Sequence, residues 1–210
     1  MKRGIGGYVG RYVRHRHGGW RGLARLLLAR AEVALGRAER FRLRHPERVR
    51  RVVFVCLGNL CRSAYAEHAA RAAGLEVASF GLLTSTGAVS PDAALRAARR
   101  QGVALEGHRA CDWRDFELRA GDLLLVMELR QARQLRRRLG KRSDVQLALL
   151  GMWCDPPLPY LHDPFGLGDE YFDRCFQHVR QAVRRLLPML PRAHARDDGG
   201  DTGEANGAIL

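Results

Sequence analysis

The sequence lacks any apolar run long enough to cross a bilayer, and its five cysteines include no CxxC pair. The first absence argues against a transmembrane segment. The second, with the lack of paired Cys/His spacing, argues against a zinc site, so we expect no metal and no cofactor. No secretory signal is recognisable, and the cysteines are therefore expected to be thiols in a reducing cytoplasm. No internal repeat is apparent.

Acidic residues are scarce at the start of the chain. The first 50 residues contain 14 Lys or Arg against 3 Asp or Glu, a formal +11 out of +14 for the whole chain, which leaves +3 for the rest. The basic character therefore belongs to this extension. Nucleic-acid binding by the remainder of the chain is not expected.

Composition divides the chain into three parts. Residues 1–50 are predicted to be a basic, partly helical extension, residues 51–191 one domain, and the Gly-rich, acidic residues 192–210 a disordered tail. Residues 20–43 have helical spacing of apolar residues with arginines between them. This segment either docks on an anionic membrane or a membrane-bound partner, or packs on the domain with its basic face in solvent, or lacks order.

Strands and helices alternate after residue 50. Short apolar runs predict four buried strands, at residues 52–55, 77–80, 123–126 and 145–149. Helical patterns follow them at residues 63–73, 91–101, 129–139 and 169–187. This alternation predicts an α/β protein, a three-layer α/β/α fold with a four-stranded parallel sheet. Such sheets bind ligands at the carboxyl ends of their strands, which directs attention to the loop after the first strand.

That loop carries the chemistry. The segment reads Arg51-Val-Val-Phe-Val-Cys56-Leu-Gly58-Asn59-Leu-Cys61-Arg62-Ser63, so Arg62 follows Cys56 by six positions across a Gly-Asn turn. A strand, a tight loop and a helix start form an anion site, because backbone N–H groups and the helix dipole converge there. The same field favours a thiolate at Cys56, and the guanidinium of Arg62 can hold two phosphoryl oxygens. We therefore expect attack of a cysteine thiolate on a bound phosphoryl group.

From residue 51 to about residue 190 the chain resembles the low-molecular-weight protein tyrosine phosphatases. Residues 55–63 resemble the phosphate-binding loop of that family. Further matching segments follow in the family's order: Ser79, Pro91-Asp92, Gly107-His108-Arg109-Ala110, residues 122–128 and His162-Asp163-Pro164-Phe165. The chain departs from the pattern where Ala64 replaces a usual proline, Phe80 a small residue and Phe165 a tyrosine. None of these departures removes a reacting group.

The resemblance implies a role for each residue of the site. Cys56 would be the nucleophile, Arg62 the clamp on the phosphoryl oxygens, and Asp163 the general acid and then base. Asp155 also precedes a proline and competes for the acid role, but the family uses the later aspartate. The loop that holds the phosphoryl group would be Leu57, Gly58, Asn59, Leu60, Cys61, Arg62 and Ser63. Phe165 would wall the pocket for the substrate ring.

Other residues would support the loop. By the resemblance, Asn59, Ser63, Ser79 and His108 form a hydrogen-bonded network that holds the loop in place. In simpler interpretations, Ser79 merely ends a strand and His108 is a solvated loop histidine. Cys61 would trap an oxidised Cys56 as a reversible disulfide, or it is only a small buried side chain at the helix start.

The prediction is a cytoplasmic protein tyrosine phosphatase, monomeric and in part membrane-peripheral through residues 1–50. Bacterial relatives often act on autophosphorylated tyrosine kinases of polysaccharide export, so a phosphotyrosine protein such as a membrane tyrosine kinase is the expected substrate. One alternative is an arsenate reductase of the same fold, which needs further cysteines, whereas none lies between Cys111 and Cys154. The other is a non-catalytic phosphotyrosine-binding scaffold, although binding alone does not need Asp163.

Overall fold

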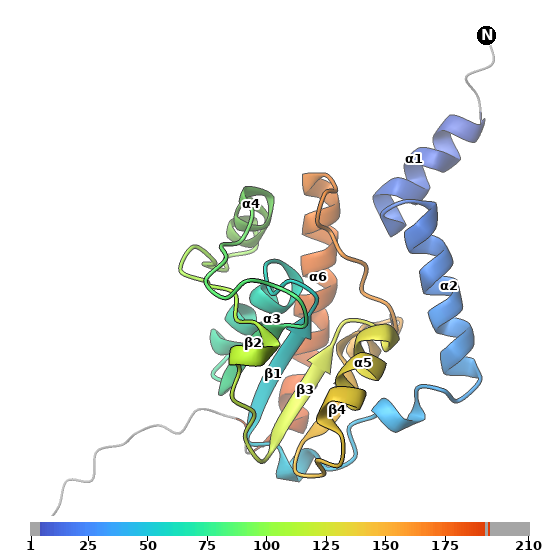
Figure 1. The fold of residues 1–210 in the computed structure, drawn as a ribbon. Helices are drawn as coiled ribbons and strands as arrows, with labels where there is room; N and C mark the ends of the chain where they lie inside the picture. The colour runs from blue at the N-terminus through green and yellow to red at the C-terminus, as the bar shows by residue number, and fades with distance from the viewer. Residues whose placement is uncertain (1–4, 192, 194–210) are drawn as a thin grey trace, which may run out of the picture.

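A four-stranded parallel sheet forms the centre of the protein (Figure 1). The computed structural model describes residues 5–191 and 193, so the predicted tail 192–210 lies, except for residue 193, outside the described residues. The strands have the order β2-β1-β3-β4. Their bounds are β1 Arg51–Cys56, β2 Val77–Gly81, β3 Asp122–Val126 and β4 Gln146–Leu149. The predicted fold class is confirmed.

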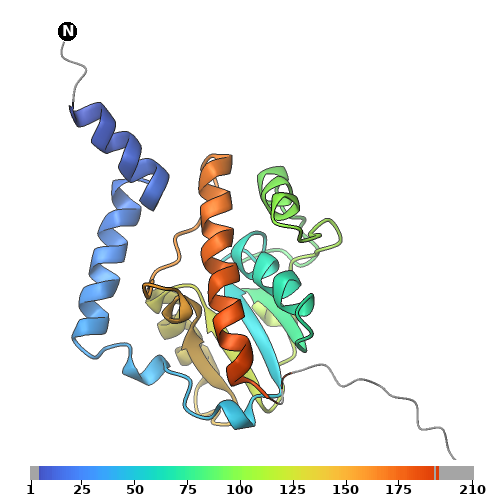
Figure 2. The same ribbon diagram turned by 180° about the vertical axis from the view of Figure 1, so that it is seen from behind.

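Helices cover both faces of the sheet, because each buried strand alternates its side chains between two apolar layers. Val52 and Phe54 of β1 share a core with α3 and α6, whereas Val53 and Val55 point to the opposite layer, which includes α5. Figure 2 shows α6 lying along one face of the sheet. The helix bounds are α3 Arg62–Arg71, α4 Asp92–Arg100, α5 Leu129–Leu139 and α6 Asp169–Leu186. Short 3-10 helices occur at Glu39–Phe41, Pro46–Arg48, Trp113–Asp115, Leu150–Trp153 and Leu187–Met189.

Two helices precede the sheet, α1 (Ile5–His17) and α2 (Trp20–Ala34), and we call them the N-terminal hairpin. The prediction of one helix over residues 20–43 was too long. Gly36, with φ +72°, ends α2, because its N–H donates to Val33 and the next N–H, of Arg37, donates to Glu32. The helix α1 was missed because its glycines weaken the helical signal.

The N-terminal hairpin packs against the loop of residues 158–165. A Cβ at Gly18 would lie 2.6 Å from the His162 ring, and one at Gly22 would lie 2.9 Å from it, so both glycines permit this close approach. Leu26 and Ala29 of α2 pack against Tyr160. The hairpin therefore covers the segment that precedes Asp163.

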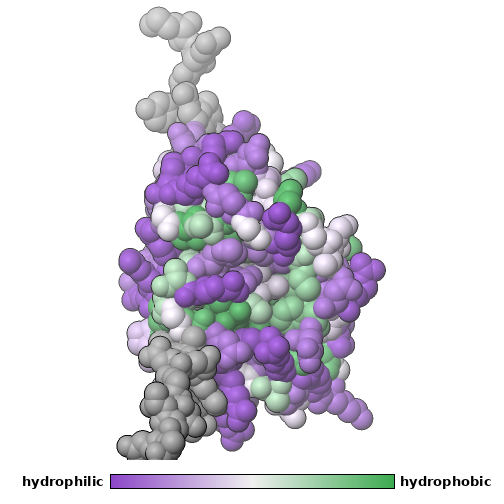
Figure 3. All heavy atoms as spheres, turned by 90° about the vertical axis from the view of Figure 1, so that its left-hand side faces the viewer, coloured by the Kyte–Doolittle hydropathy of each residue, from purple (hydrophilic) through white to green (hydrophobic). Residues whose placement is uncertain are grey.

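The surface on the side away from the N-terminal hairpin is partly apolar (Figure 3). On the face seen in Figure 3, apolar residues gather near the centre and hydrophilic residues surround them. Within the described residues, no helix is both long and apolar enough to cross a membrane.

Candidate active site

Cys56 ends β1, and the loop after it turns back so that its polar groups surround the sulfur. Asn59 makes this turn with φ +53°, a left-handed conformation that Asn tolerates better than most residues. Its backbone N–H donates to Cys56 Sγ at 3.2 Å, and Ser63 Oγ lies 3.0 Å from the same sulfur. Donors that converge on Sγ stabilise a thiolate more than a thiol.

Arg62 begins α3 and is buried, with its side chain 2% exposed. Its Nη1 donates to the carbonyl of Leu161 at 2.9 Å, and its Nη2 forms an ion pair with Asp163. Burial opposes the positive charge, but the Asp163 carboxylate and the Cys56 sulfur raise the pKa of the Arg62 guanidinium, so it stays charged. Its buried Nε has no hydrogen-bond partner among the described residues. That donor is available to a phosphoryl oxygen in the loop.

Asp163 reaches the loop because the 158–165 segment is tied to the end of β3. Leu161 N–H donates to the carbonyl of Met127 at 2.9 Å. Phe165 N–H donates to Oδ1 of Asp163 at 3.2 Å, which leaves Oδ2 facing Arg62. Asp155, the competing candidate, lies elsewhere and pairs with Arg185 at 3.1 Å. Geometry therefore brings the later aspartate to the cysteine and leaves the earlier one outside.

A cavity of about 210 Å³ opens at the cysteine. Most of the surface that lines it is apolar. The lining residues are Cys56, Leu57, Gly58, Leu60, Cys61, Leu83, Asp163 and Phe165. Phe165, the predicted wall for the substrate ring, lines this cavity and is 64% exposed.

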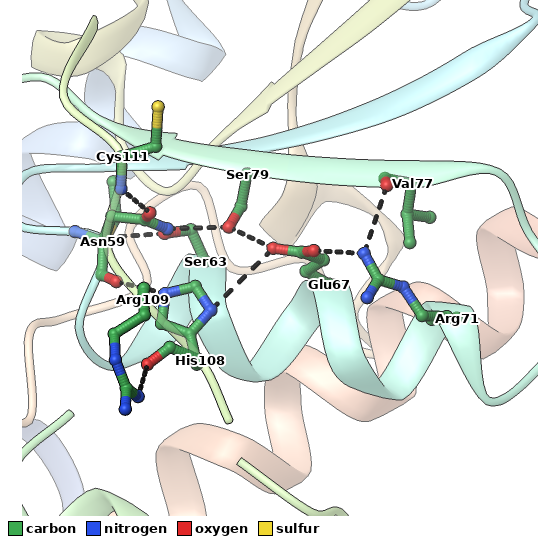
Figure 4. A network of polar contacts seen from close by, with 10 residues as sticks. Asn59, Ser63, Glu67, Arg71, Val77, Ser79, His108, Arg109 and Cys111 are labelled. Carbon is green, nitrogen blue, oxygen red and sulfur yellow. Dashed lines mark hydrogen bonds and ion pairs between the residues drawn. The ribbon is translucent and has the colours of Figure 1, made fainter. Parts of the chain in front are cut away.

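The predicted support residues lie together behind the loop (Figure 4). The side-chain amide of Asn59 donates to Ser63 Oγ at 2.9 Å and to Ser79 Oγ at 2.7 Å. The Nε2 of His108 contacts the Asn59 carbonyl at 2.8 Å, and Cys111 N–H donates to Asn59 Oδ1 at 2.9 Å. Asn59 thus connects the loop with β2 and with the segment that carries His108.

Glu67 completes this network and was missed by sequence reasoning. Ser79 Oγ donates to Glu67 Oε2 at 2.5 Å, Arg71 pairs with the other carboxylate oxygen, and His108 Nδ1 lies 4.0 Å away. The available signal was helical spacing, since Glu67 follows Ser63 by one turn and shares its face. Burial lowers the pKa of His108, which favours the neutral ring.

Cys61 lies in the loop and is 4% exposed. Burial raises the pKa of the Cys61 thiol, and the charge of Asp163 acts in the same direction. Among the described residues all five cysteines are free thiols. Cys175 of α6 is a second buried thiol near the loop, and burial raises its pKa to about 12.

Two departures from the family pattern lie at fully buried positions. Ala64 is fully buried in the first turn of α3. Phe80 is also fully buried, and its ring packs against Trp113 at 5.4 Å and Phe116 at 4.6 Å between centroids. The larger side chain at position 80 therefore fills the core on the side away from the loop support.

A cysteine nucleophile, a buried arginine for phosphoryl oxygens and an aspartate beside them are the groups that a cysteine-dependent phosphatase needs. A sequence profile described as "Low molecular weight phosphotyrosine protein phosphatase" matches residues 51–196. The chain therefore belongs to the low-molecular-weight protein tyrosine phosphatase family. The arsenate reductase alternative is not supported by this match.

Individual relatives agree with this assignment. Wzb of Escherichia coli (strain K12), a low molecular weight protein-tyrosine-phosphatase, is 32% identical over 144 residues, 66% of this chain and 94% of Wzb. The crystal structure of the Erwinia amylovora tyrosine phosphatase AmsI has a TM-score of 0.58 at 28% identity and covers 69% of this chain and 95% of AmsI. The YwlE arginine phosphatase from Geobacillus stearothermophilus has a TM-score of 0.59 at 23% identity, and the match covers 67% of this chain and 92% of YwlE. This similarity concerns the fold alone.

Proposed function

We propose that Cys56 is the nucleophile of a two-step phosphotyrosine hydrolysis. In the first step its thiolate attacks phosphorus, the bond between phosphorus and the tyrosine oxygen breaks, and Asp163 protonates the leaving oxygen. In the second step Asp163 takes a proton from water, which attacks phosphorus and releases Cys56 and inorganic phosphate. The observation that carries this proposal is the position of Asp163, which forms an ion pair with Arg62 and lines the Cys56 cavity.

Arg62 and the loop supply the charge stabilisation in this proposal. Residues Leu57, Gly58, Leu60 and Cys61 line the cavity, and the guanidinium of Arg62 stays charged despite its burial. Phosphoryl transfer needs mostly positioning and neutralisation of the equatorial oxygens, which a loop and a guanidinium provide. All these groups come from one chain, so a monomer is sufficient for activity.

An aromatic substrate suits the walls of the cavity. Leu57, Leu60, Leu83 and Phe165 present apolar surface around the sulfur. A phenyl ring buries favourably against such walls, and Phe165 can pack against it edge-on or offset. The charged guanidinium of a phosphoarginine gains less from the same surface, because apolar walls offer no acceptors to its N–H donors. Tyrosine is therefore the proposed phosphorylated residue, although the fold also occurs in an arginine phosphatase.

The Asn59, Ser63, Ser79 and His108 network is proposed to hold the loop before substrate arrives. Ser63 connects it to the reaction, because its hydroxyl can donate to the Cys56 sulfur while accepting from the Asn59 amide. Cys61 is proposed as the redox guard of Cys56. Its raised pKa keeps it a thiol, so it does not compete as a nucleophile at neutral pH.

The N-terminal hairpin is proposed to bring this cytoplasmic enzyme to an anionic membrane, close to a membrane tyrosine kinase of polysaccharide export as substrate. The outer face of α2 supports this. Trp20, Leu27, Leu28 and Leu35 are 60%, 55%, 67% and 68% exposed, on the side opposite to the buried Leu26 and Ala29. The extension that carries them has a formal charge of +11. Exposed apolar residues beside basic ones are typical of interfacial helices.

One assay tests the central claim. The purified full chain should release phosphate from a phosphotyrosine peptide in the presence of a metal chelator, and Cys56→Ser should abolish turnover. A phosphoarginine peptide of the same sequence is the matched comparison. Turnover that survives Cys56→Ser would remove the proposed nucleophile, and a preference for phosphoarginine would remove the proposed substrate class.

A further inference from the structure

A second cavity, of about 330 Å³, lies between the N-terminal hairpin and the rest of the protein. One side is formed by α1 and α2, and the other by α6 and the 158–165 loop. Among the described residues, its lining shares no member with that of the Cys56 cavity. Its volume is in the range of small-molecule sites, which is about 300–1,000 Å³.

The lining is strongly basic. Arg16 of α1, Arg30 of α2 and Arg174 of α6 approach from three helices, together with His17 and His178. None of the described residues that line the cavity is acidic. Within residues 5–191, moreover, none of these three guanidinium groups has a carboxylate partner. Three helices thus contribute to one cavity arginine side chains that form no ion pair within residues 5–191.

Burial and the positive charge of these arginines lower the pKa values of the two histidines. Burial first, and then Arg16, Arg174 and Arg30, lower the pKa of His17. Burial, followed by Arg174 and Arg16, lowers the pKa of His178. Because both rings respond to the same arginines, these charges act on the same space.

The remaining walls are apolar or aromatic, with one unsatisfied polar atom. Leu26, Leu158 and Tyr171 contribute to them, as does His162, whose buried Nδ1 has no hydrogen-bond partner among the described residues. Convergent cationic groups on an otherwise apolar wall are the usual composition of a site for a small anionic ligand. Guanidinium groups in particular fit the oxygen geometry of phosphates.

We propose that this cavity binds a small phosphate-bearing anion, held by Arg16, Arg30 and Arg174. The phosphate belongs either to a soluble phosphate ester or to the headgroup of an anionic lipid. The ligand would also contact Leu161 and His162, directly before Asp163, so that it bridges the N-terminal hairpin and the 158–165 loop.

Titration of the histidine rings in the full chain by NMR tests this proposal with inorganic pyrophosphate as the probe. The His17 and His178 signals are assigned by comparison with His17→Gln and His178→Gln. Bound pyrophosphate should raise the pKa of both histidines, because it offsets the charge of the arginines. This readout is local to the cavity and does not depend on turnover, so it stays informative if the proposed phosphatase chemistry fails.

Substitution of the arginines supplies the second measurement. Arg30→Gln with Arg174→Gln should weaken the apparent pyrophosphate affinity about tenfold or more, since two charge-assisted contacts are lost. Arg37→Gln, in the same extension but outside the cavity, is the matched control and should leave the affinity unchanged. If millimolar pyrophosphate leaves both histidines of the unsubstituted chain unmoved, or if the double variant binds as tightly as the control, the proposal is overturned.

The two sources of phosphate are distinguished by a second probe, a short-chain phosphatidic acid below its micelle concentration. Tighter binding of this lipid than of pyrophosphate, with the same loss in the double variant, identifies a headgroup site. Tighter binding of pyrophosphate identifies a soluble phosphate ester. Both results support an anion site in the cavity, whereas failure of both probes to shift His17 and His178 contradicts it.

Discussion

Arg62 and Asp163 form an ion pair although 101 positions separate them in the sequence. The guanidinium is buried at the start of α3, and the carboxylate, 40% exposed, lies at the mouth of the Cys56 cavity. In the proposed mechanism, a phosphoryl group that binds both Nε and Nη2 of Arg62 displaces Asp163 from Nη2. The displaced carboxyl group is then free to approach the leaving oxygen.

The first prediction concerns the acid. Asp163→Ala should lower kcat for phenyl phosphate about 10²- to 10⁴-fold, because phenolate leaves slowly without a proton. The loss with p-nitrophenyl phosphate should be much smaller, since its leaving group needs little protonation. KM should not rise, because Arg62 loses its competing partner. Steady-state kinetics with the two substrates measure this difference.

Asp155→Ala is the matched control, because Asp155 also precedes a proline but pairs with Arg185 away from the cavity. It should leave both rates unchanged. If Asp155→Ala instead shows the dependence on the leaving group, the acid is Asp155 and the geometry of the Arg62 pair has no catalytic meaning.

The second prediction concerns Asn59. Asn59→Ala should destabilise the protein by about 1–3 kcal/mol, since buried polar groups of Ser63, Ser79 and Cys111 lose their partner. It should also lower kcat, because the loop is less well held.

Asn59→Gly separates the loss of these hydrogen bonds from the strain of the backbone at position 59. It loses the same side chain, but glycine tolerates φ +53°. Urea unfolding should show the Ala variant less stable than Gly by about 1 kcal/mol. Equal stability of both variants with the unsubstituted chain would show that the network holds nothing.

The sequence predicted the sheet and the Cys-to-Arg loop well, because both depend on local patterns. Apolar runs located four strands, and the Gly-Asn turn after Cys56 located the loop. Glu67 was missed because its role depends on Ser79 and His108, which reach it from distant segments. The contact of α2 with Tyr160 was out of reach for the same reason. Tertiary partners decide such roles, and a single sequence does not contain their positions.

The third prediction is a loss of stability at mildly acidic pH. The pKa values of His17, His108, His162 and His178 are all lowered from 6.5, mainly by burial. Between the folded and unfolded pKa values, the unfolded chain binds more protons, so the free energy of unfolding rises with pH. The free energy of unfolding should therefore fall as pH drops from about 6.5 through the lowered pKa values. Above about pH 7 these histidines should not change it.

Urea unfolding at several pH values between 5 and 8 measures this dependence. His108→Gln keeps an N–H that can donate to the Asn59 carbonyl but removes one of the four titrating groups. Its slope of stability against pH below 6.5 should be shallower than that of the unsubstituted chain. An unchanged slope would mean that His108 does not contribute to it.

The fourth prediction concerns oxidation. Hydrogen peroxide converts the Cys56 thiolate to a sulfenic acid, and the Cys61 thiol condenses with it to a disulfide with loss of water. A dithiol then reduces this disulfide, so activity should return fully after brief peroxide treatment. Cys61→Ala should lose activity irreversibly, because Cys56 is oxidised further. Mass spectrometry should find a Cys56–Cys61 peptide only where Cys61 is present.

Cys175→Ala is the control for this experiment, since Cys175 is also buried and near the loop. It should recover activity as the unsubstituted chain does. Recovery that depends on Cys175 and not on Cys61 would transfer the guard role to α6.

The last prediction concerns the outer face of α2. Leu27→Gln with Leu28→Gln should weaken binding to phosphatidylglycerol vesicles about tenfold or more, because two exposed apolar side chains no longer enter the lipid. Hydrolysis of p-nitrophenyl phosphate should not change, since neither side chain touches the site. Val89→Gln, at a residue 62% exposed on the rest of the domain, is the matched control. Salt should weaken binding of the unsubstituted chain by screening its arginines. Vesicle binding that is equal in the double variant and the control would show that α2 does not face the membrane.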